Sequence, residues 1–190
     1  MKKLFIALFL LAFCVSISGA GVTQDKLKVI AKKNASAGEI GTIVHDNSFS
    51  SYTDNVYHDL FTTTTAGPVN YAHAYVAGLD GNTTCLSIYD SGGNELASCT
   101  VADPGTDAAG WVNCKLDAEV TLVAATTYYG SIYTAQGGAQ NVLYLEVAGA
   151  GCWRDSETHT CTDAIGNPEE ELQATDDLSI FFNNSAGDPN

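Results

Sequence analysis

The hydrophobic residues of this chain recur in short runs, many of which alternate apolar with polar residues. Alternation places the apolar side chains on one face of a β-strand, so each run predicts a strand with one buried face. Val, Ile, Thr, Tyr and Phe, which favour strands, are frequent in these runs, and Gly, Asn, Asp and Pro separate them. The predicted strands are Ile40–His45, Val56–Thr63, Val69–Val76, Thr83–Asp90, Glu95–Val101, Trp111–Leu116, Thr127–Tyr133, Val142–Val147 and Leu178–Phe182.

The sequence has no convincing amphipathic helical period. The one short candidate, Asp25–Lys33, is equally a first strand or an exposed basic arm. Many short strands with closely spaced turn signals are typical of an antiparallel sandwich or barrel, so we predict an all-β fold. Two long loops are expected, Ala102–Gly110 and Ala148–Thr175, and loops of such length are usually functional or disordered.

The N-terminus has the features of a secretory signal peptide. Two lysines precede the apolar run Leu4–Ser16, and small residues end at Ala20. This run is shorter than the ~20 residues that a membrane span needs, so no spanning segment is predicted. The rival interpretation is a lipoprotein modified at Cys14, which the bulky Phe13 before it disfavours. The predicted domains are a signal peptide (1–20), an N-terminal arm or first strand (21–37) and a single β-sandwich domain (38–190).

The chain is strongly acidic, with 22 Asp and Glu against 8 Lys and Arg, a net charge of −14. Such a surface repels nucleic acid and anionic membranes, so neither is an expected partner. No cofactor is predicted. Structural calcium remains open because carboxylates are abundant, although no stretch has the EF-hand spacing. The candidate calcium ligands are Asp80, Asn82, Asp103, Asp107, Asp176 and Asp177.

The stretch Asp90–Gly93 reads DSGG, the letters around the nucleophilic serine of trypsin-like proteases. Such an enzyme needs a histidine base far upstream of that serine. The upstream histidines, His45, His58 and His73, leave no room for two barrels, so we predict a hairpin turn and no enzyme. Carboxylate-pair catalysis by a small glycosidase or polysaccharide lyase is the weakest hypothesis, because no spacing singles out a pair.

The hairpin carries a disulfide prediction. Folding the chain about Gly92 sets Ile88 opposite Leu96 and Cys85 opposite Cys99, and opposed residues lie close enough to bridge. We therefore predict a Cys85–Cys99 disulfide.

A second predicted disulfide, Cys152–Cys161, would close the polar loop between these residues. A competing arrangement folds the chain at Ala102–Gly110 and pairs Cys99 with Cys114. It is disfavoured because Cys114 falls on the inward face of its predicted strand and Cys99 on the outward face. Cys114 is instead expected as a buried thiol.

The order of several short motifs resembles secreted jelly-roll β-sandwich modules of the carbohydrate-binding type, which recur in bacterial surface proteins, secreted enzymes and phage structural proteins. The resemblance implies a jelly-roll sandwich and carries no defined binding residues. One departure is Ala124-Ala125 where such modules usually have Ala-Gly. The motifs are Phe61-Thr62-Thr63, Gly67-Pro68-Val69, Leu86–Asp90, Glu95-Leu96-Ala97, Gly110-Trp111-Val112, Leu116-Asp117, Val120-Thr121-Leu122 and Thr126–Tyr129.

The candidate ligand-binding residues are Trp153, Arg154 and Tyr128. Trp153 and Arg154 follow Cys152 in a predicted loop, where an exposed indole beside a guanidinium suits sugar stacking. The alternative is that Trp153 anchors its own loop. Alternation places Tyr128 opposite Tyr129 and Tyr133, so at least one of these tyrosines is expected to be exposed.

Other chemistry-bearing residues are predicted to have structural roles. Trp111 is expected in the core. His45-Asp46 and His58-Asp59 are interpreted as polar residues at strand ends.

We therefore predict an exported, non-catalytic module, secreted or at a cell surface, that recognises glycan or a surface protein. The alternative is a structural subunit of a surface appendage or matrix, a homopolymer in which the arm at 25–33 pairs with a neighbour's sheet edge.

Overall fold

The computed structural model describes the β-sandwich part of the chain. The described residues are 38–50, 55–78, 83–101, 108–134, 142–146, 151–155, 161, 164–165, 171–174 and 176–187, all within the compact unit Ala35–Asn190. The predicted signal peptide, the arm at 21–37 and the candidate calcium ligands at 80, 82, 103 and 107 lie outside the described residues. No helix long and apolar enough to cross a membrane is found in the described part.

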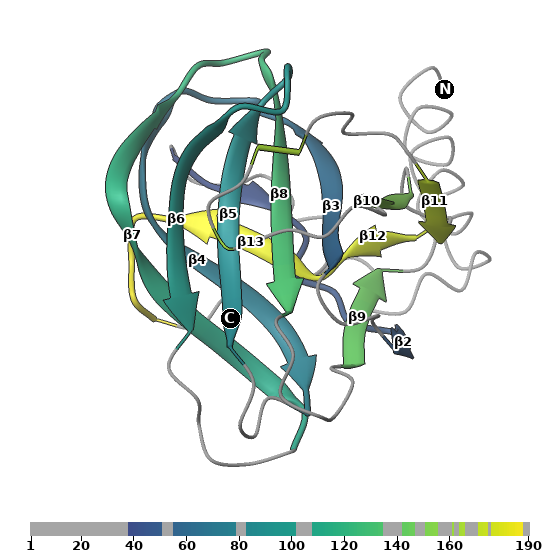
Figure 1. Cartoon of the computed structure of the whole chain (residues 1–190). Coiled ribbons are helices and arrows are strands. Elements are labelled where there is room, and N and C mark those ends of the chain that lie inside the picture. The colour runs from purple at the N-terminus through teal and green to yellow at the C-terminus, as the bar shows by residue number, and fades with distance from the viewer. Residues whose placement is uncertain are drawn as a thin grey trace, which may run out of the picture. The chain divides into compact units, whose positions relative to one another are not determined.

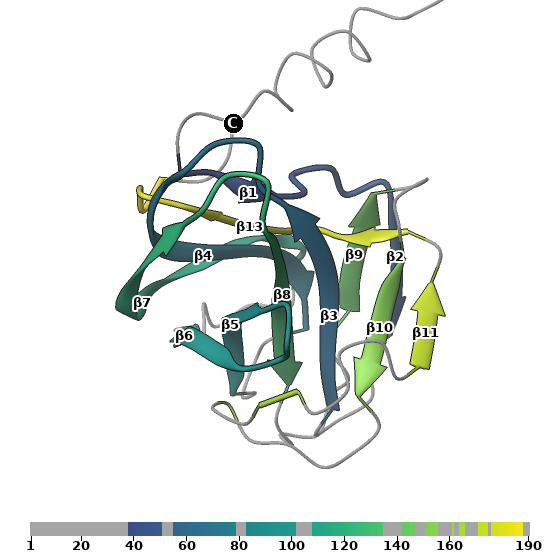
Figure 2. The ribbon, with the colours of Figure 1, turned by 90° about the horizontal axis from the view of Figure 1, so that it is seen from above.

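Two antiparallel sheets form a sandwich, as predicted (Figure 1). Figure 2 shows the two layers from above, with β4, β7 and β13 in one and β3, β5, β6 and β8 in the other. Sheet A contains β1 (Ile40–Gly41), β2 (Asn47–Ser50), β4 (Gly67–Ala77), β7 (Gly110–Leu122), β9 (Val142–Glu146), β12 (Asp177–Leu178) and β13 (Ile180–Asn183). Sheet B contains β3 (Asn55–Thr62), β5 (Thr84–Asp90), β6 (Glu95–Val101), β8 (Thr127–Thr134), β10 (Cys152–Asp155) and β11 (Glu171–Ala174).

The central predicted strands are confirmed within a few residues at their ends. The structure extends β7 to Leu122, well past the predicted end at Leu116, and reduces Ile40–His45 to the two residues of β1. Three strands were not predicted, namely β2, β10 and β11. β10 and β11 lie inside the stretch predicted as a long loop, where they pair with each other, and β10 also pairs with β3.

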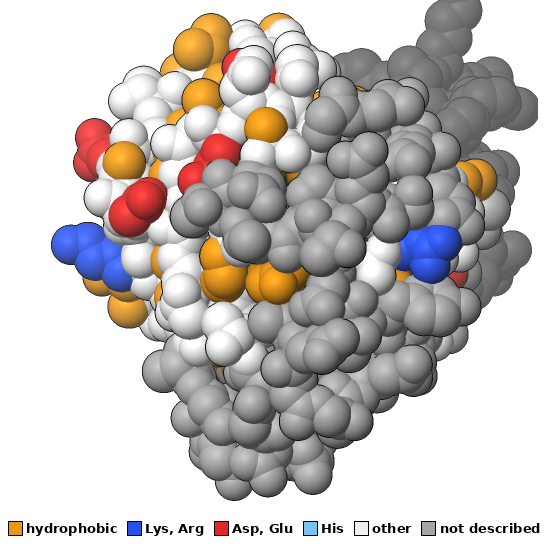
Figure 3. Space-filling model, viewed as in Figure 1, with side chains coloured by type: hydrophobic (Ala, Val, Ile, Leu, Met, Phe, Trp, Pro, Cys, Tyr) orange, Lys and Arg blue, Asp and Glu red, His pale blue; other side chains and the backbone are white. Residues whose placement is uncertain are grey.

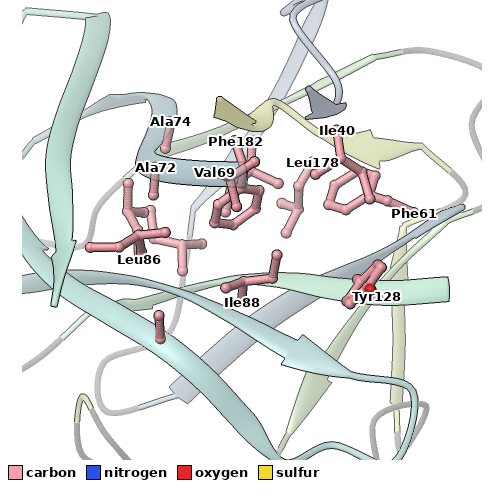
Figure 4. Close-up of a cluster of buried hydrophobic side chains, with 14 of the residues drawn as sticks. Ile40, Phe61, Val69, Ala72, Ala74, Leu86, Ile88, Tyr128, Leu178 and Phe182 are labelled. Atoms are coloured by element: carbon pink, nitrogen blue, oxygen red, sulfur yellow. The ribbon is translucent and has the colours of Figure 1, made fainter. Parts of the chain in front are cut away.

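The main hydrophobic core lies between the two sheets (Figure 4). Leu86 and Ile88 from sheet B face Val69, Ala72 and Phe182 from sheet A. Close packing also explains Gly130 on β8. A Cβ atom there would lie 2.6 Å from the ring of Phe182 and 2.7 Å from the ring of Phe61.

A second, smaller hydrophobic cluster covers the outer face of sheet B. It contains Val56, Cys85, Tyr89, Tyr129, Tyr133 and Ile165. Ile165 comes from the chain beyond β10, and its backbone N–H donates to the carbonyl of Gly93 at 3.2 Å. Gly93 has φ +78°, and a Cβ atom there would lie 2.2 Å from the carbonyl oxygen of Ile165, so this contact requires glycine.

The DSGG stretch is a hairpin turn, as predicted, but its register differs by one residue. Ile88 pairs with Ala97 and Tyr89 with Glu95, so Leu96 is the extra residue of a β-bulge. The bulge turns Cys99 inward and pairs Leu86 with it, while Cys85 pairs with Thr100 and faces outward. Because a shift of one residue moves every side chain to the other face, Cys85 and Cys99 cannot bridge.

Both predicted disulfides are therefore wrong. Cys99 bonds Cys114, the competing pair, with 5.8 Å between their Cα atoms. Cys85 bonds Cys161 instead, with 5.5 Å between Cα atoms, and holds the chain beyond β10 over the outer face of sheet B. Cys152, predicted to be bridged, is a fully buried thiol in the main core.

The Cys99–Cys114 bond joins β6, at the edge of sheet B, to β7 of sheet A. A second link crosses beside it, since the backbone N–H of Ser98 on β6 donates to the carboxylate of Asp117 on β7 at 3.0 Å. We call this junction of the two sheets the β6–β7 seam.

Candidate functional site

Trp153 and Arg154 lie in strand β10, not at the tip of a loop. β10 pairs with β3 on one side and β11 on the other, and Trp153 is directly opposite His58. Both predicted site residues are half-buried, and the Trp153 ring is stacked toward His58 with 6.4 Å between centroids. Neighbouring residues of a strand point to opposite faces, so the two side chains do not share a surface.

Tyr128 lies on the inner face of β8, and its ring belongs to the main core. Its hydroxyl accepts a hydrogen bond from the backbone N–H of Val123 at 3.0 Å. Tyr129 and Tyr133 are buried on the outer face, so the expectation of an exposed tyrosine among the three is wrong. The covering chain that contains Ile165 is the reason. The three predicted binding residues therefore do not form one site.

His58 and Asp59 lie in the middle of β3, where the sequence predicted a strand end, and both are fully buried. The Asp59 carboxylate accepts hydrogen bonds from the backbone N–H groups of Leu60 and Leu178, each at 2.7 Å. Since Leu178 is in sheet A and Asp59 in sheet B, this carboxylate ties the two sheets together.

An aromatic group lies on the outer face of sheet A, where the sequence predicted none. Tyr75 on β4 and Trp111 on β7 are directly paired across the two strands, with 5.5 Å between their ring centroids at 81°. His45 stacks on Tyr75 at 3.8 Å and 12°, and meets Trp111 edge-on at 6.1 Å. Tyr75 and Trp111 are half-buried and His45 is exposed. We call these three residues the outer aromatic cluster.

The segment after β1 positions His45. Thr42 donates its backbone N–H to the carbonyl of Ile180 at 2.7 Å, and the Ser179 hydroxyl donates to the carbonyl of Val44. The Tyr75 N–H also donates to the carbonyl of Ser179, at 3.0 Å. Both the histidine segment and Tyr75 are therefore fixed against the same stretch near β13.

Polar groups continue along the same face of β4 and β7. His73 pairs with Asn113, and Tyr71 with Lys115. His73 is fully buried, with its Nε2 3.0 Å from the Asn183 side chain and 3.1 Å from the Ser185 carbonyl. Asn113 and Tyr71 are half-buried and Lys115 is exposed. The face thus combines half-buried aromatic rings with side chains that form hydrogen bonds.

The sequence did contain a signal for this site. Val112, Cys114 and Leu116 share the inward face of β7, so alternation assigns Trp111 to the outward face. The prediction of Trp111 as a core residue did not apply this alternation and is wrong, because Trp111 lies half-buried on the outer face. The contribution of His45 depends on the path of a loop, which no local pattern encodes.

A pocket with a volume of about 420 Å³ lies at one end of the sandwich. Its walls come from the β5–β6 hairpin, the end of β7 and the start of β8. We call it the end pocket. Among its lining residues are Asp90, Ser91, Leu96, Glu119, Thr121 and Tyr128. Tyr128, a predicted binding residue, contributes to this pocket and not to the outer aromatic cluster.

Asp90 organises the turn beside this pocket. Its Oδ1 accepts hydrogen bonds from the backbone N–H groups of Gly92 and Asn94, at 2.8 and 3.0 Å, and both of its oxygens accept from the Asn94 side chain. These bonds, that of the Asn94 side chain above all, lower the pKa of Asp90 below its ordinary value. Asp90 therefore stays ionised as a turn-holding residue. In the described part, no group of three or more metal-ligating side chains is found.

No curated protein matches this chain. Residues 60–149 match the model of a family described as a domain of unknown function, DUF4082. The matched segment includes Tyr75, Trp111 and the residues of the end pocket, whereas Trp153 and Arg154 lie beyond it.

Proposed function

We propose that this protein is an exported, non-catalytic module that binds glycan through the outer aromatic cluster. The observation that carries the proposal is the paired Tyr75 and Trp111, with exposed His45 against them. Aromatic faces offer a large apolar area with little loss of conformational entropy, which suits the C–H face of a sugar ring. Asn113 on the same face of β7 supplies amide groups for sugar hydroxyls.

Two further features support export and the absence of catalysis. The disulfides Cys85–Cys161 and Cys99–Cys114 indicate an oxidising environment, which agrees with the secretory signal predicted for residues 1–20. Ser91 lies exposed at a hairpin turn whose aspartate already holds the turn itself. That arrangement favours a structural role for the protease-like stretch.

The two tryptophans of this chain provide a matched test. Glycan ligands are first found by binding the purified protein to a glycan array. Affinity is then measured by calorimetry for the parent, Trp111→Ala and Trp153→Ala. We expect Trp111→Ala to weaken binding by about 1–3 kcal/mol, the range for losing a large apolar contact. Trp153→Ala should leave the affinity unchanged.

The reverse pattern would move the site to β10, where the sequence first suggested it. Equal affinity for the parent and both variants would contradict an aromatic site on either sheet. Circular dichroism at the binding temperature confirms that each variant is folded, because Trp111 and Trp153 are both half-buried.

A further inference from the structure

We infer that the end pocket is a second, separate ligand site, which takes a single sugar ring bearing a protonated amino group. The inference goes beyond the outer aromatic cluster and does not depend on it. Trp111 lies near the start of β7, whereas the pocket is lined by Glu119, Val120 and Thr121 near its end. Their partners on β4 are Tyr75 for Trp111 and Val69 for Val120, six residues apart, so at about 3.3 Å per residue the two sites are roughly 20 Å apart along the sheet.

The size and lining of the pocket favour a small polar ligand with one apolar face. Its volume of about 420 Å³ is within the range of small-molecule sites and exceeds what one sugar ring needs. Leu96, Val120 and Tyr128 supply apolar surface, and Leu96 is 38% exposed because the β-bulge turns it away from the core. A pyranose ring can rest its C–H face on such side chains.

Hydrogen-bonding groups lie next to this apolar surface. The side chains of Ser91 and Thr121 are exposed and line the pocket, so their hydroxyls can both donate to and accept from a sugar. The carboxylates of Asp90 and Glu119 can only accept. A ligand that satisfies these groups must therefore have more hydrogen-bond donors than acceptors on the side that faces the end pocket.

The negative charge of the end pocket favours a ligand that carries a protonated amino group. Asp90 is kept ionised by the hydrogen bonds of its turn, and Glu119 is held by one bond from the Asn70 amide at 3.2 Å. Lys115 and Arg154 are the basic residues of the described part, and neither lines the pocket. Two carboxylates with no basic partner among the described residues attract a cation and disfavour an acidic sugar.

The test compares four sugars by NMR titration: glucosamine, glucose, N-acetylglucosamine and glucuronate. At low ionic strength we expect glucosamine to bind about 5-fold or more tightly than glucose or N-acetylglucosamine, and glucuronate to bind most weakly. Added salt should reduce the advantage of glucosamine, since exposed charges are screened. Equal binding of glucosamine and glucuronate, or no binding of any sugar, overturns the inference.

Variants locate the site. Glu119→Gln should lower glucosamine affinity several-fold, whereas Asp46→Asn makes the same change in net charge outside the pocket and should not. Because Glu119 also binds Asn70, Thr121→Val serves as a second variant that removes one hydroxyl and should weaken all the sugars. Trp111→Ala should leave glucosamine binding intact, which separates this inference from the proposed function. Equal losses in Asp46→Asn and Glu119→Gln would contradict a localised site.

Discussion

At the scale of single residues, one residue in the turn between β7 and β8 has an unfavourable backbone conformation. Ala125 has φ +56°, the left-handed region that residues with a Cβ atom disfavour. The turn is fixed in place because Ala125 donates its N–H to the carbonyl of Thr63 at 2.9 Å, and Thr126 donates to the Thr63 hydroxyl at 3.3 Å. The β-sandwich modules that this chain resembles usually have glycine at this position, and glycine adopts the left-handed conformation without strain.

Ala125→Gly is therefore expected to stabilise the protein. The left-handed conformation costs an alanine about 1–2 kcal/mol, and part of that gain is offset because glycine has more freedom in the unfolded chain. We expect a net increase of about 0.5–1 kcal/mol in the free energy of unfolding, measured by urea denaturation. The neighbouring Ala124→Gly is the control and should be neutral or destabilising. A loss of stability in Ala125→Gly would contradict this account of the turn.

Asp90 gives a prediction with a defined pH dependence. Its folded-state pKa is lowered from the ordinary value of 3.8 by hydrogen bonds from Asn94 and Gly92. The carboxylate therefore stabilises the fold above about pH 4, and this contribution is lost as the pH falls through the lowered pKa. Asp90→Ala should cost about 1 kcal/mol at pH 7, a modest value because the turn is solvent-exposed.

The difference in stability between the parent and Asp90→Ala should shrink as the pH falls from 7 toward about 3. Denaturant titrations at several pH values measure it. A difference that is constant with pH would show that the charge of Asp90 is not what holds the turn.

At the scale of elements, alternation predicted the strands that cross the core and failed where tertiary pairing decides. β3, β5, β6 and β8 have long alternating or apolar runs, and the structure confirms them. β10 has only four residues, Cys152–Asp155, and it is a strand because β3 and β11 lie on either side of it. No local pattern contains that information.

The disulfide pairing also could not be predicted from local sequence patterns. One bulged residue, Leu96, reverses the faces of Cys85 and Cys99, and the sequence gives no separate sign of the bulge. Cys161 reaches Cys85 because a distant segment folds over sheet B. The outer aromatic cluster was predictable in part. The position of Trp111 on β7 follows from alternation, but His45 lies in a loop, whose path no local pattern indicates.

At the scale of the whole molecule, charge sets the kind of partner. Figure 3 shows Asp and Glu side chains gathered at one side of the viewed face, over β6 and β7, while Lys and Arg appear at two opposite edges. With a net charge of −14, the protein repels anionic polymers and attracts cationic ligands, while neutral ligands are neither attracted nor repelled by that charge. Both proposed sites agree with this charge. The outer aromatic cluster would bind a neutral glycan by stacking, and the end pocket would bind a cationic sugar by ion pairing.

The β6–β7 seam has a consequence for self-association. The edge of a sheet offers unpaired backbone groups to which a strand of another molecule can add. Here β6 and β7 are tied side by side by Cys99–Cys114, and Asp117 already accepts the edge N–H of Ser98. The two edges therefore shield each other, and a fibre that grew by strand addition could not start at this junction.

Removing the Cys99–Cys114 disulfide should make the protein self-associate without unfolding it. A Cys99→Ser/Cys114→Ser variant is expected to gain mass with rising concentration in light scattering, while its circular dichroism stays that of a β-protein. Cys85→Ser/Cys161→Ser loses a disulfide elsewhere and should keep the mass of the parent. If both variants associate equally, general loss of stability is the cause. If only the seam variant does, its disulfide protects the protein from aggregation as well as stabilising its fold.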